Sequence, residues 1–135
     1  MDRIIRASAL VIEDGKLLAV RNNFSPLYLM PGGKVKPGET ELQALGREVM
    51  EETCTKVSGA EKFREYDVEK ALFQDKPMTI VTYFTKIEGV PSPGHEIVDV
   101  VWLGPDNYNN YKLAPTFGGM IVPDLVKEGF LNFRL

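Results

Sequence analysis

Three glutamates stand close together in the stretch GREVMEETCTKV, from Gly46 to Val57. If this stretch is helical, Glu48, Glu51 and Glu52 are spaced at i, i+3 and i+4, which places their carboxylates on one side of the helix. Like charges at this spacing destabilise a helix by roughly 0.2–0.5 kcal/mol per pair. One interpretation is a solvated acidic surface on which Arg47 pairs with Glu51. The other is that the carboxylates bind a ligand.

The segment before the helix favours the interpretation that the carboxylates bind a ligand. The loop PGGKVKPGE, residues 31–39, has three glycines and two prolines and ends at Glu39, so bare backbone lies beside the helix start. A hard divalent cation binds this mixture of carboxylate and carbonyl oxygens, and it reduces the repulsion between the glutamates. We therefore expect a metal site where the loop meets the helix.

The stretch GKVKPGETELQALGREVMEETCT, from Gly33 to Thr55, resembles the signature box of the Nudix hydrolases. That box reads glycine, five residues, glutamate, seven residues, Arg-Glu, an aliphatic residue, any residue, Glu-Glu, any residue, glycine and an aliphatic residue. The sequence departs from it at the end, where Cys54 replaces the glycine and Thr55 replaces the aliphatic residue. The positions that match are Gly33, Glu39, Arg47, Glu48, Val49, Glu51 and Glu52.

The resemblance implies an α/β fold, with an α/β/α sandwich around a mixed β-sheet and a single domain over residues 1–135. It also implies that Mg²⁺ or Mn²⁺ binds to Glu48, Glu51 and Glu52, together with the backbone carbonyl of Gly32. Family members hydrolyse a nucleoside diphosphate linked to another group. Bound metals suit this reaction because they neutralise phosphate charge and lower the pKa of the attacking water.

Three further residues of the box are expected to support the site without touching substrate. In similar proteins the equivalents of Arg47 and Glu39 form an ion pair, and a guanidinium fork can hold a carboxylate bidentately. The third supporting residue is Gly33. The ion pair between Arg47 and Glu39 would fix the loop against the helix.

The general base is either Glu48, from the box, or Glu96, in the stretch PSPGHEIVDVVW, since family members differ in this respect. Glu96 could instead be a charge that protects a strand edge. Its neighbour His95 is the only histidine, and it is either a second candidate base or an exposed loop residue.

Other side chains are candidates for substrate contacts. Arg21 and Lys36 are candidate contacts to phosphate. Phe24, Tyr28 and Phe84 are aromatic residues that either stack on a base or belong to the core. We take Arg21 and Phe24 as the predicted substrate contacts.

The composition excludes several classes of protein. At 135 residues, 44% hydrophobic and 26% charged, the chain matches an average soluble globular domain. Cys54 is the only cysteine and lacks the histidine pattern of a thiol nucleophile, so we expect a structural role and a reducing, cytoplasmic location.

The net charge of −3 does not favour binding to a nucleic-acid polymer, and no apolar run predicts a membrane span. The expected partner is a small nucleotide, and a homodimer stays open.

The N-terminal half is expected to position the site with strands and one helix. β-rich runs predict strands over Ile4–Ile12 and Lys16–Arg21, joined by a turn at Asp14-Gly15. A short strand, LYLM (27–30), should run into the glycine-rich loop, through which we expect no regular structure.

The helix is predicted from Thr40 to about Thr53. Thr40 and Gln43 form a capping-box pattern, and a core-facing stripe is expected at Leu42, Leu45 and Val49. Further strands are predicted for KFREYDV (62–68), MTIVTYFTKI (78–87) and EIVDVVWL (96–103), followed by a helix within APTFGGMIVPDLVKEGFL (114–131) that Gly118, Gly119 and Pro123 interrupt.

The expected reaction is hydrolysis of a nucleoside triphosphate to a monophosphate and pyrophosphate. Lys70 stands where relatives that prefer ADP-ribose carry proline, and residues 71–73, Ala-Leu-Phe, stand where dinucleoside polyphosphate enzymes carry tyrosine. The small size of the chain and the loop MPGGKVKPGE (30–39) resemble the nucleotide-sanitising branch of the family, which includes 8-oxo-dGTP hydrolases. The alternatives are another nucleoside diphosphate derivative as substrate, a Nudix-fold binding or regulatory protein, and an unrelated α/β protein with an acidic face.

Overall fold

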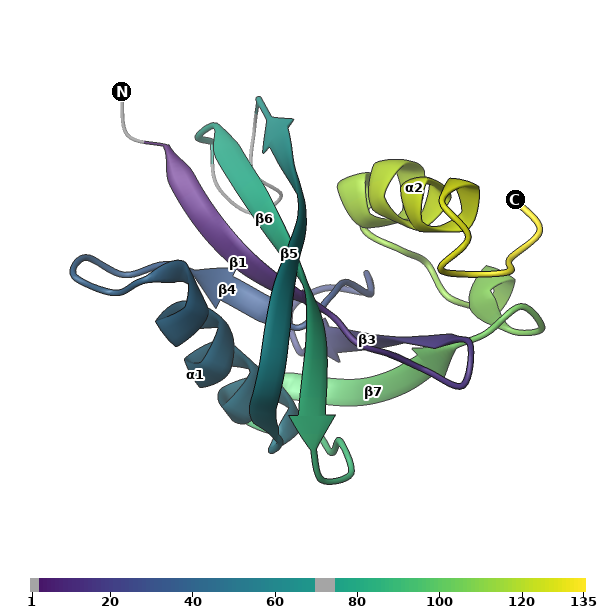
Figure 1. Ribbon diagram of the computed structural model, residues 1–135, viewed down its shortest axis with the longest axis horizontal. Helices are drawn as coiled ribbons and strands as arrows, with labels where there is room; N and C mark the ends of the chain where they lie inside the picture. The colour runs from purple at the N-terminus through teal and green to yellow at the C-terminus, as the bar shows by residue number, and fades with distance from the viewer. Residues whose placement is uncertain (1–2, 70–74) are drawn as a thin grey trace.

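The computed structural model describes residues 3–69 and 75–135 and shows β-sheets with a helix on either side (Figure 1). Lys70 and residues 71–73, on which the substrate prediction drew, lie outside the described residues. The strands are β1 (Ile4–Leu10), β2 (Ile12–Glu13), β3 (Lys16–Asn22), β4 (Gly32–Lys34), β5 (Lys56–Val68), β6 (Met78–Glu88) and β7 (Ile97–Leu103), and the α-helices are α1 (Glu41–Thr53) and α2 (Val122–Lys127).

The strands form two sheets. One has the order β4-β1-β6-β5, in which β1 is parallel to β6 and the other neighbours are antiparallel, and the other has the antiparallel order β2-β3-β7. Ala44, Leu45 and Val49 of α1 pack on one side of the sheets, whereas Leu125 of α2 and the preceding Ile121 pack on the other. The expected mixed α/β architecture with outer helices is therefore confirmed.

The first predicted strand is divided in two. Instead of one strand over Ile4–Ile12, β1 ends at Leu10 and the chain passes to the other sheet, where Ile12–Glu13 pairs with Lys16 and Leu17. The turn between them is as expected, since Asp14 and Gly15 both have positive φ angles, of 53° and 75°. The sequence pattern did not show the break because apolar residues continue through it.

The prediction for the glycine-rich segment was wrong in two respects. LYLM forms only isolated bridges, between Leu29 and Val20 and between Tyr28 and Leu113, whereas a short strand, β4, runs through Gly32–Lys34. Glycine is unfavourable within strands, but a Cβ on Gly32 would lie 2.2 Å from the Ala7 carbonyl oxygen of β1. The close approach of these strands therefore explains why glycine occupies this position.

Helix α1 begins where the sequence predicts. Thr40 caps it and forms the capping box with Gln43, in which each side chain accepts the other residue's backbone N–H. Leu45 and Val49 face the core as expected, but Leu42 is 55% exposed, and Ala44 takes the buried position instead. The apolar stripe is therefore narrower than the sequence suggested.

The C-terminal segment folds as two helical pieces. A π-helical turn, Phe117–Ile121, precedes α2 and includes Gly118 and Gly119. Gly118 packs against Leu113, because a Cβ there would lie 2.9 Å from the leucine Cβ. A 3₁₀ turn, Tyr108–Asn110, lies upstream. Within the described residues, no helix has the length and apolar character needed to cross a bilayer.

Candidate active site

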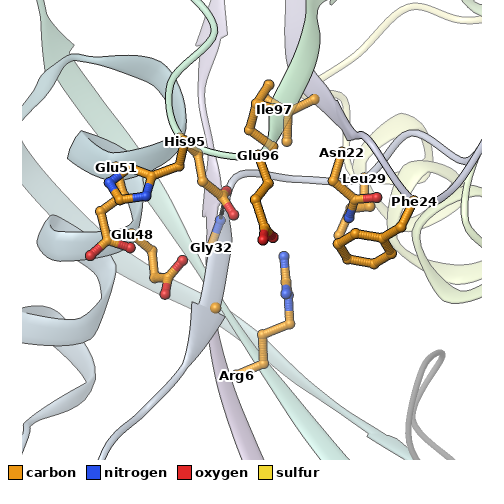
Figure 2. A pocket seen from close by; sticks show the side chains of 13 residues that line it. Arg6, Asn22, Phe24, Leu29, Gly32, Glu48, Glu51, His95, Glu96 and Ile97 are labelled. Carbon is orange, nitrogen blue, oxygen red and sulfur yellow. Dashed lines mark hydrogen bonds between the residues drawn. The ribbon is translucent and has the colours of Figure 1, made fainter.

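A pocket of about 340 Å³ lies where α1, β4, the end of β3 and the loop before β7 meet. Figure 2 shows Glu48 and Glu51 on one side of it, Asn22 and Phe24 on the other, and Arg6 between them. The pocket thus has an acidic half and a half that carries an amide and an aromatic ring.

All three box glutamates line this pocket. Glu48 and Glu51 have side chains that are 16% and 35% exposed. Glu52 accepts a hydrogen bond of 3.0 Å from the backbone N–H of Gly32, which ties the end of the helix to β4. The structure therefore brings the predicted carboxylates and the predicted backbone position together.

Gly33 makes room for one of these carboxylates. A Cβ at this position would lie 2.5 Å from both carboxylate oxygens of Glu48. Any larger residue would therefore push Glu48 out of its place beside β4. This contact gives a physical reason for glycine at the first position of the box.

Arg47 connects the loop to the acidic face of α1. It donates two hydrogen bonds to Glu39, from Nε to Oε2 at 2.8 Å and from Nη2 to Oε1 at 2.9 Å. It also donates to Glu48 at 2.7 Å and to the carbonyl of Lys34 at 3.1 Å. The hydrogen bonds from Arg47 lower the pKa of Glu39 to about 2, and those to Glu39 and Glu48 raise the pKa of Arg47.

Glu52 is the carboxylate whose titration is most affected by its surroundings. Burial raises its pKa to about 7, against the positive charge of Arg6 and the hydrogen bond from Gly32, while the charges of Glu48 and Glu51 raise it further. Ionised Glu52 is therefore unfavourable in the metal-free protein. A bound cation would remove this disadvantage.

The donor set fits a hard divalent cation, but the side chains are not yet arranged around one. Among residues 3–69 and 75–135, no three acidic, histidine or cysteine side chains are grouped to hold a metal as they stand. Glu48 is held by Arg47 and Glu52 by Gly32. These hydrogen bonds use Oε1 of each glutamate, so each carboxylate keeps a second oxygen of the kind that such cations prefer.

The loop between β6 and β7 carries Glu96 and His95 into the pocket (Figure 2). Its backbone caps the end of α1, since Ser92 N donates to Thr53 O at 2.9 Å and Gly94 N donates to Glu52 O at 3.1 Å. A Cβ on Gly94 would lie 2.3 Å from the Glu51 carbonyl oxygen. Glycine at this position therefore allows the close contact that places both residues beside the box glutamates.

Cys54 adopts the left-handed conformation that glycine usually supplies at the end of such a helix. Its φ and ψ are 59° and 31°, its side chain is exposed, and its N–H donates to Met50 O at 3.0 Å. The helix therefore keeps the left-handed end that the box glycine would supply, although Cys54 carries a Cβ.

Thr55, the second departure from the box, is buried and 1% exposed. Its hydroxyl lies 2.6 Å from that of Thr53, which in turn donates to Val49 O at 2.7 Å. The threonine thus occupies a buried position where the box has an aliphatic residue, and its polar atom is satisfied.

The predicted substrate contacts lie in different places. Phe24 lines the pocket and is 59% exposed. Arg21 is not among the lining residues; it donates to the carbonyl of Ser25 at 3.3 Å and lies 5.9 Å from the centre of the Tyr28 ring. Tyr28 is buried and donates to Asp99.

Two other candidates also lie outside the pocket lining. Phe84 packs on Phe63 and Phe130, with ring centres 4.9 and 4.6 Å away. Lys36 donates its backbone N–H to Glu39 at 3.0 Å, within the loop.

Arg6 and Asn22 line the pocket but were not chosen from the sequence. Arg6 lies on β1, donates from Nε to Ser8 Oγ at 3.2 Å and from Nη2 to the Met30 carbonyl at 3.1 Å, and faces the acidic half. Burial lowers its pKa, and the charges of Glu52 and Glu48 act in the opposite direction. A charged residue within an apolar strand was the available signal for Arg6, whereas nothing distinguished Asn22.

A family model described as NUDIX domain matches residues 2–124. The chain belongs to the NUDIX family. Members of this family generally use divalent metals and act on small nucleotide substrates, in agreement with the resemblance carried by the box.

Two relatives and one solved structure show how similar other members are. A Bacillus subtilis (strain 168) protein, named provisionally as an 8-oxo-dGTP diphosphatase, is 33% identical over 95 residues, or 69% of this chain and 60% of the relative. A MutT-like protein of Streptomyces ambofaciens is 32% identical over 103 residues, or 74% of this chain and 62% of the relative. The chain thus spans less than two thirds of either. The solution structure of the E. coli ORF135 protein has a TM-score of 0.78 and 26% identity, covering 96% of this chain and 93% of that one.

Proposed function

We propose that this protein uses a divalent cation to hydrolyse a nucleoside triphosphate to a nucleoside monophosphate and pyrophosphate. The observation that carries the proposal is the gathering of Glu48, Glu51, Glu52 and Glu96 around one pocket, with Arg6 between its two halves. The oxygen of water joins a phosphorus atom of the anhydride, its proton passes to a base, and the bridging oxygen leaves with the other phosphate group.

Glu48, Glu51 and Glu52 would hold Mg²⁺ or Mn²⁺ together with the carbonyl oxygen of Gly32. When bound, the cation neutralises phosphate charge and lowers the pKa of an attached water. Arg6 offers a guanidinium, which suits a phosphate oxygen. Its hydrogen bonds to Ser8 and Met30 hold that group in place for such a contact.

Glu96 is our choice for the general base. Glu48 is already engaged by Arg47 at 2.7 Å and lies against Gly33, which suits a ligand held in one position. Glu96 comes from the loop before β7, and Figure 2 shows its carboxylate pointing into the pocket. Its backbone is fixed, because Asn23 N donates to Glu96 O at 2.9 Å. A fixed backbone limits how far the carboxylate can move from the attacking water.

An oxidised purine nucleoside triphosphate is the first substrate to test. The name of the Bacillus subtilis relative supports this class. The single exposed cysteine agrees with a reducing, cytoplasmic location, where such nucleotides would be encountered.

The second candidate is a NUDIX-fold binding protein that has lost turnover. Its support is Cys54, the departure from the box at the end of α1. The retained geometry of that helix end argues against it, as do the intact glutamates, whose mutual repulsion would serve no purpose in a protein that binds without metal.

A panel of nucleoside triphosphates and nucleoside diphosphate derivatives, assayed with and without Mg²⁺, tests the proposal. We expect monophosphate and pyrophosphate to appear only with the metal, and Glu52→Gln to reduce turnover at least about a hundredfold. Metal-independent turnover, or the same rate in that variant, would overturn the proposal. Nucleotide binding without turnover would favour the second candidate.

A further inference from the structure

We infer that Asn22 reads the base of the nucleotide by accepting a hydrogen bond from one of its N–H groups. This inference rests on the proposed function and adds a specificity-determining residue to it. The observation behind it is Asn22 Oδ1, the one buried side-chain nitrogen or oxygen atom without a hydrogen-bond partner among the residues that the structure describes.

Buried polar atoms in folded proteins nearly always have partners, so an unpaired acceptor requires an explanation. Asn22 lines the pocket, and rotation of its amide about χ2 would turn Oδ1, which the protein now covers, toward a ligand in this space. An acceptor needs a donor, and the N–H groups on the edge of a nucleobase are donors of that kind. The unpaired carbonyl oxygen is therefore suited to the nucleobase, the part of the substrate that phosphate-binding groups do not contact.

The position of Asn22 within the pocket points to the base and not to the phosphates. Figure 2 shows it beside Leu29 and Phe24, across from the acidic residues of α1. An amide oxygen cannot favour a phosphate, which offers only acceptors at neutral pH. If the phosphates and metal bind at the acidic half, the base of the same nucleotide lies in the half that contains Asn22.

Local strand geometry fixes Asn22 in this place. It is the last residue of β3, and the register between β3 and β7 shifts between Arg21 and Asn22, so that Asn22 pairs with Ile97. Such irregularities re-aim a side chain relative to the regular strand pattern. The hydrogen bond from Asn23 N to Glu96 O follows directly, so the same shift positions Asn22 and Glu96.

Asn22→Leu is the matched substitution, because leucine has nearly the same shape and no polar atoms. Asn23→Leu is the control, since Asn23 is exposed and does not line the pocket. The substrates are pairs of triphosphates that differ in one base N–H donor group: GTP and ITP, ATP and purine riboside triphosphate, and CTP and its analogue without the 4-amino group.

We expect the wild-type protein to prefer the donor-bearing member of at least one pair by about tenfold, mainly through KM. Asn22→Leu should lose this preference, with a ratio near one, and Asn23→Leu should keep it. A preference that is unchanged in Asn22→Leu, or absent from the wild-type protein, overturns the inference.

Thermal unfolding without ligand separates base recognition from a structural role. Removing an unpaired buried acceptor should leave the Tm of Asn22→Leu equal to that of the wild type or higher. A clear fall in Tm would mean that Asn22 supports the fold, and the inference would fail.

Binding of the same pairs as α,β-methylene analogues, measured by calorimetry with Mg²⁺, distinguishes this inference from the proposed function. If analogues bind with an Asn22-dependent preference but triphosphates are not hydrolysed, base recognition stands and the hydrolysis proposal fails. If hydrolysis occurs with a preference that does not depend on Asn22, hydrolysis stands and base recognition fails.

Discussion

On the α2 side of the molecule, charged and polar side chains are paired at the rim of an apolar core. Arg64 contacts Asp124 and Glu128, and Tyr66 donates to Asp124 at 2.6 Å. Burial and Asp124 raise the pKa of Tyr66, so its hydroxyl keeps its proton and the hydrogen bond persists. These contacts connect β5 to Asp124 of α2 and to Glu128 at its end.

The acidic side of the molecule, at the end of α1, is arranged differently. Glu52 has a raised pKa, Asn22 Oδ1 has no partner among the described residues, and Cys54 occupies a left-handed conformation. Each feature is unfavourable for the fold alone, and all three lie in or next to the pocket. We therefore expect the α2 side to contribute mainly to stability and the acidic side to ligand binding.

Phe117→Ala should have the largest effect on stability. Phe117 is 1% exposed and packs in the core beneath α2, so its truncation should reduce the free energy of unfolding by roughly 3–5 kcal/mol. Leu42→Ala, at an exposed position on α1, is the control and should change stability little. Chemical denaturation measures both. If the free energy of unfolding fell only slightly in Phe117→Ala, the expectation that stability lies mainly on the α2 side would be wrong.

Glu96→Gln should have a large effect on rate and almost none on folding. If Glu96 is the general base, kcat should fall by about a hundredfold or more, because an amide cannot accept the proton. Glu88→Gln, at an exposed position at the end of β6, should behave as wild type. Steady-state kinetics decide the assignment, and a wild-type kcat in Glu96→Gln would return the role of base to Glu48.

The Glu39–Arg47 pair should act as a unit. Removal of either side chain should reduce turnover about tenfold, because each holds the loop against α1, and the double variant should lose little more than either single one. If the fold reduction in turnover of the double variant equalled the product of the two single reductions, the residues would act independently. The low pKa of Glu39, about 2, means that this pair should break only as pH falls from about 4.5 toward 2.

Cys54→Gly should have the smallest effect on activity. Glycine adopts the left-handed conformation freely, so we expect the free energy of unfolding to rise by about 1 kcal/mol, after allowance for the greater entropy of the unfolded chain. Turnover should stay within a few-fold of wild type, since Glu52 is already in place. A large gain in activity would instead identify the natural protein as a disabled enzyme.

The sequence predicted those parts of the site that depend on local spacing. The capping box at Thr40 sets the start of α1, and helical periodicity then places Glu48, Glu51 and Glu52 together. Glu96 was a candidate only through the family resemblance, because its position depends on a loop that caps the helix from a distant part of the chain.

Features that depend on strand pairing were not predicted. β4 forms because Gly32 allows close approach to β1, which overrides the low preference of glycine for strands. Arg6 and Asn22 reach the pocket from β1 and β3, through a sheet order and a register shift that no local pattern encodes. Leu42 matched the helical period but lies just outside the buried stripe.

The pH dependence of unfolding, compared between wild type and Glu52→Gln, tests most directly whether the acidic pocket exists for a cation. Burial raises the Glu52 pKa to about 7 in the fold, so between about pH 4.5 and 7 the folded state binds more protons than the unfolded one. Stability of the metal-free wild type should therefore fall by roughly 1–3 kcal/mol as pH rises through this range, relative to the variant. Saturating Mg²⁺ at pH 8 should restore the wild type and leave Glu52→Gln nearly unchanged. Parallel pH profiles, or equal stabilisation of both proteins by Mg²⁺, would contradict the account.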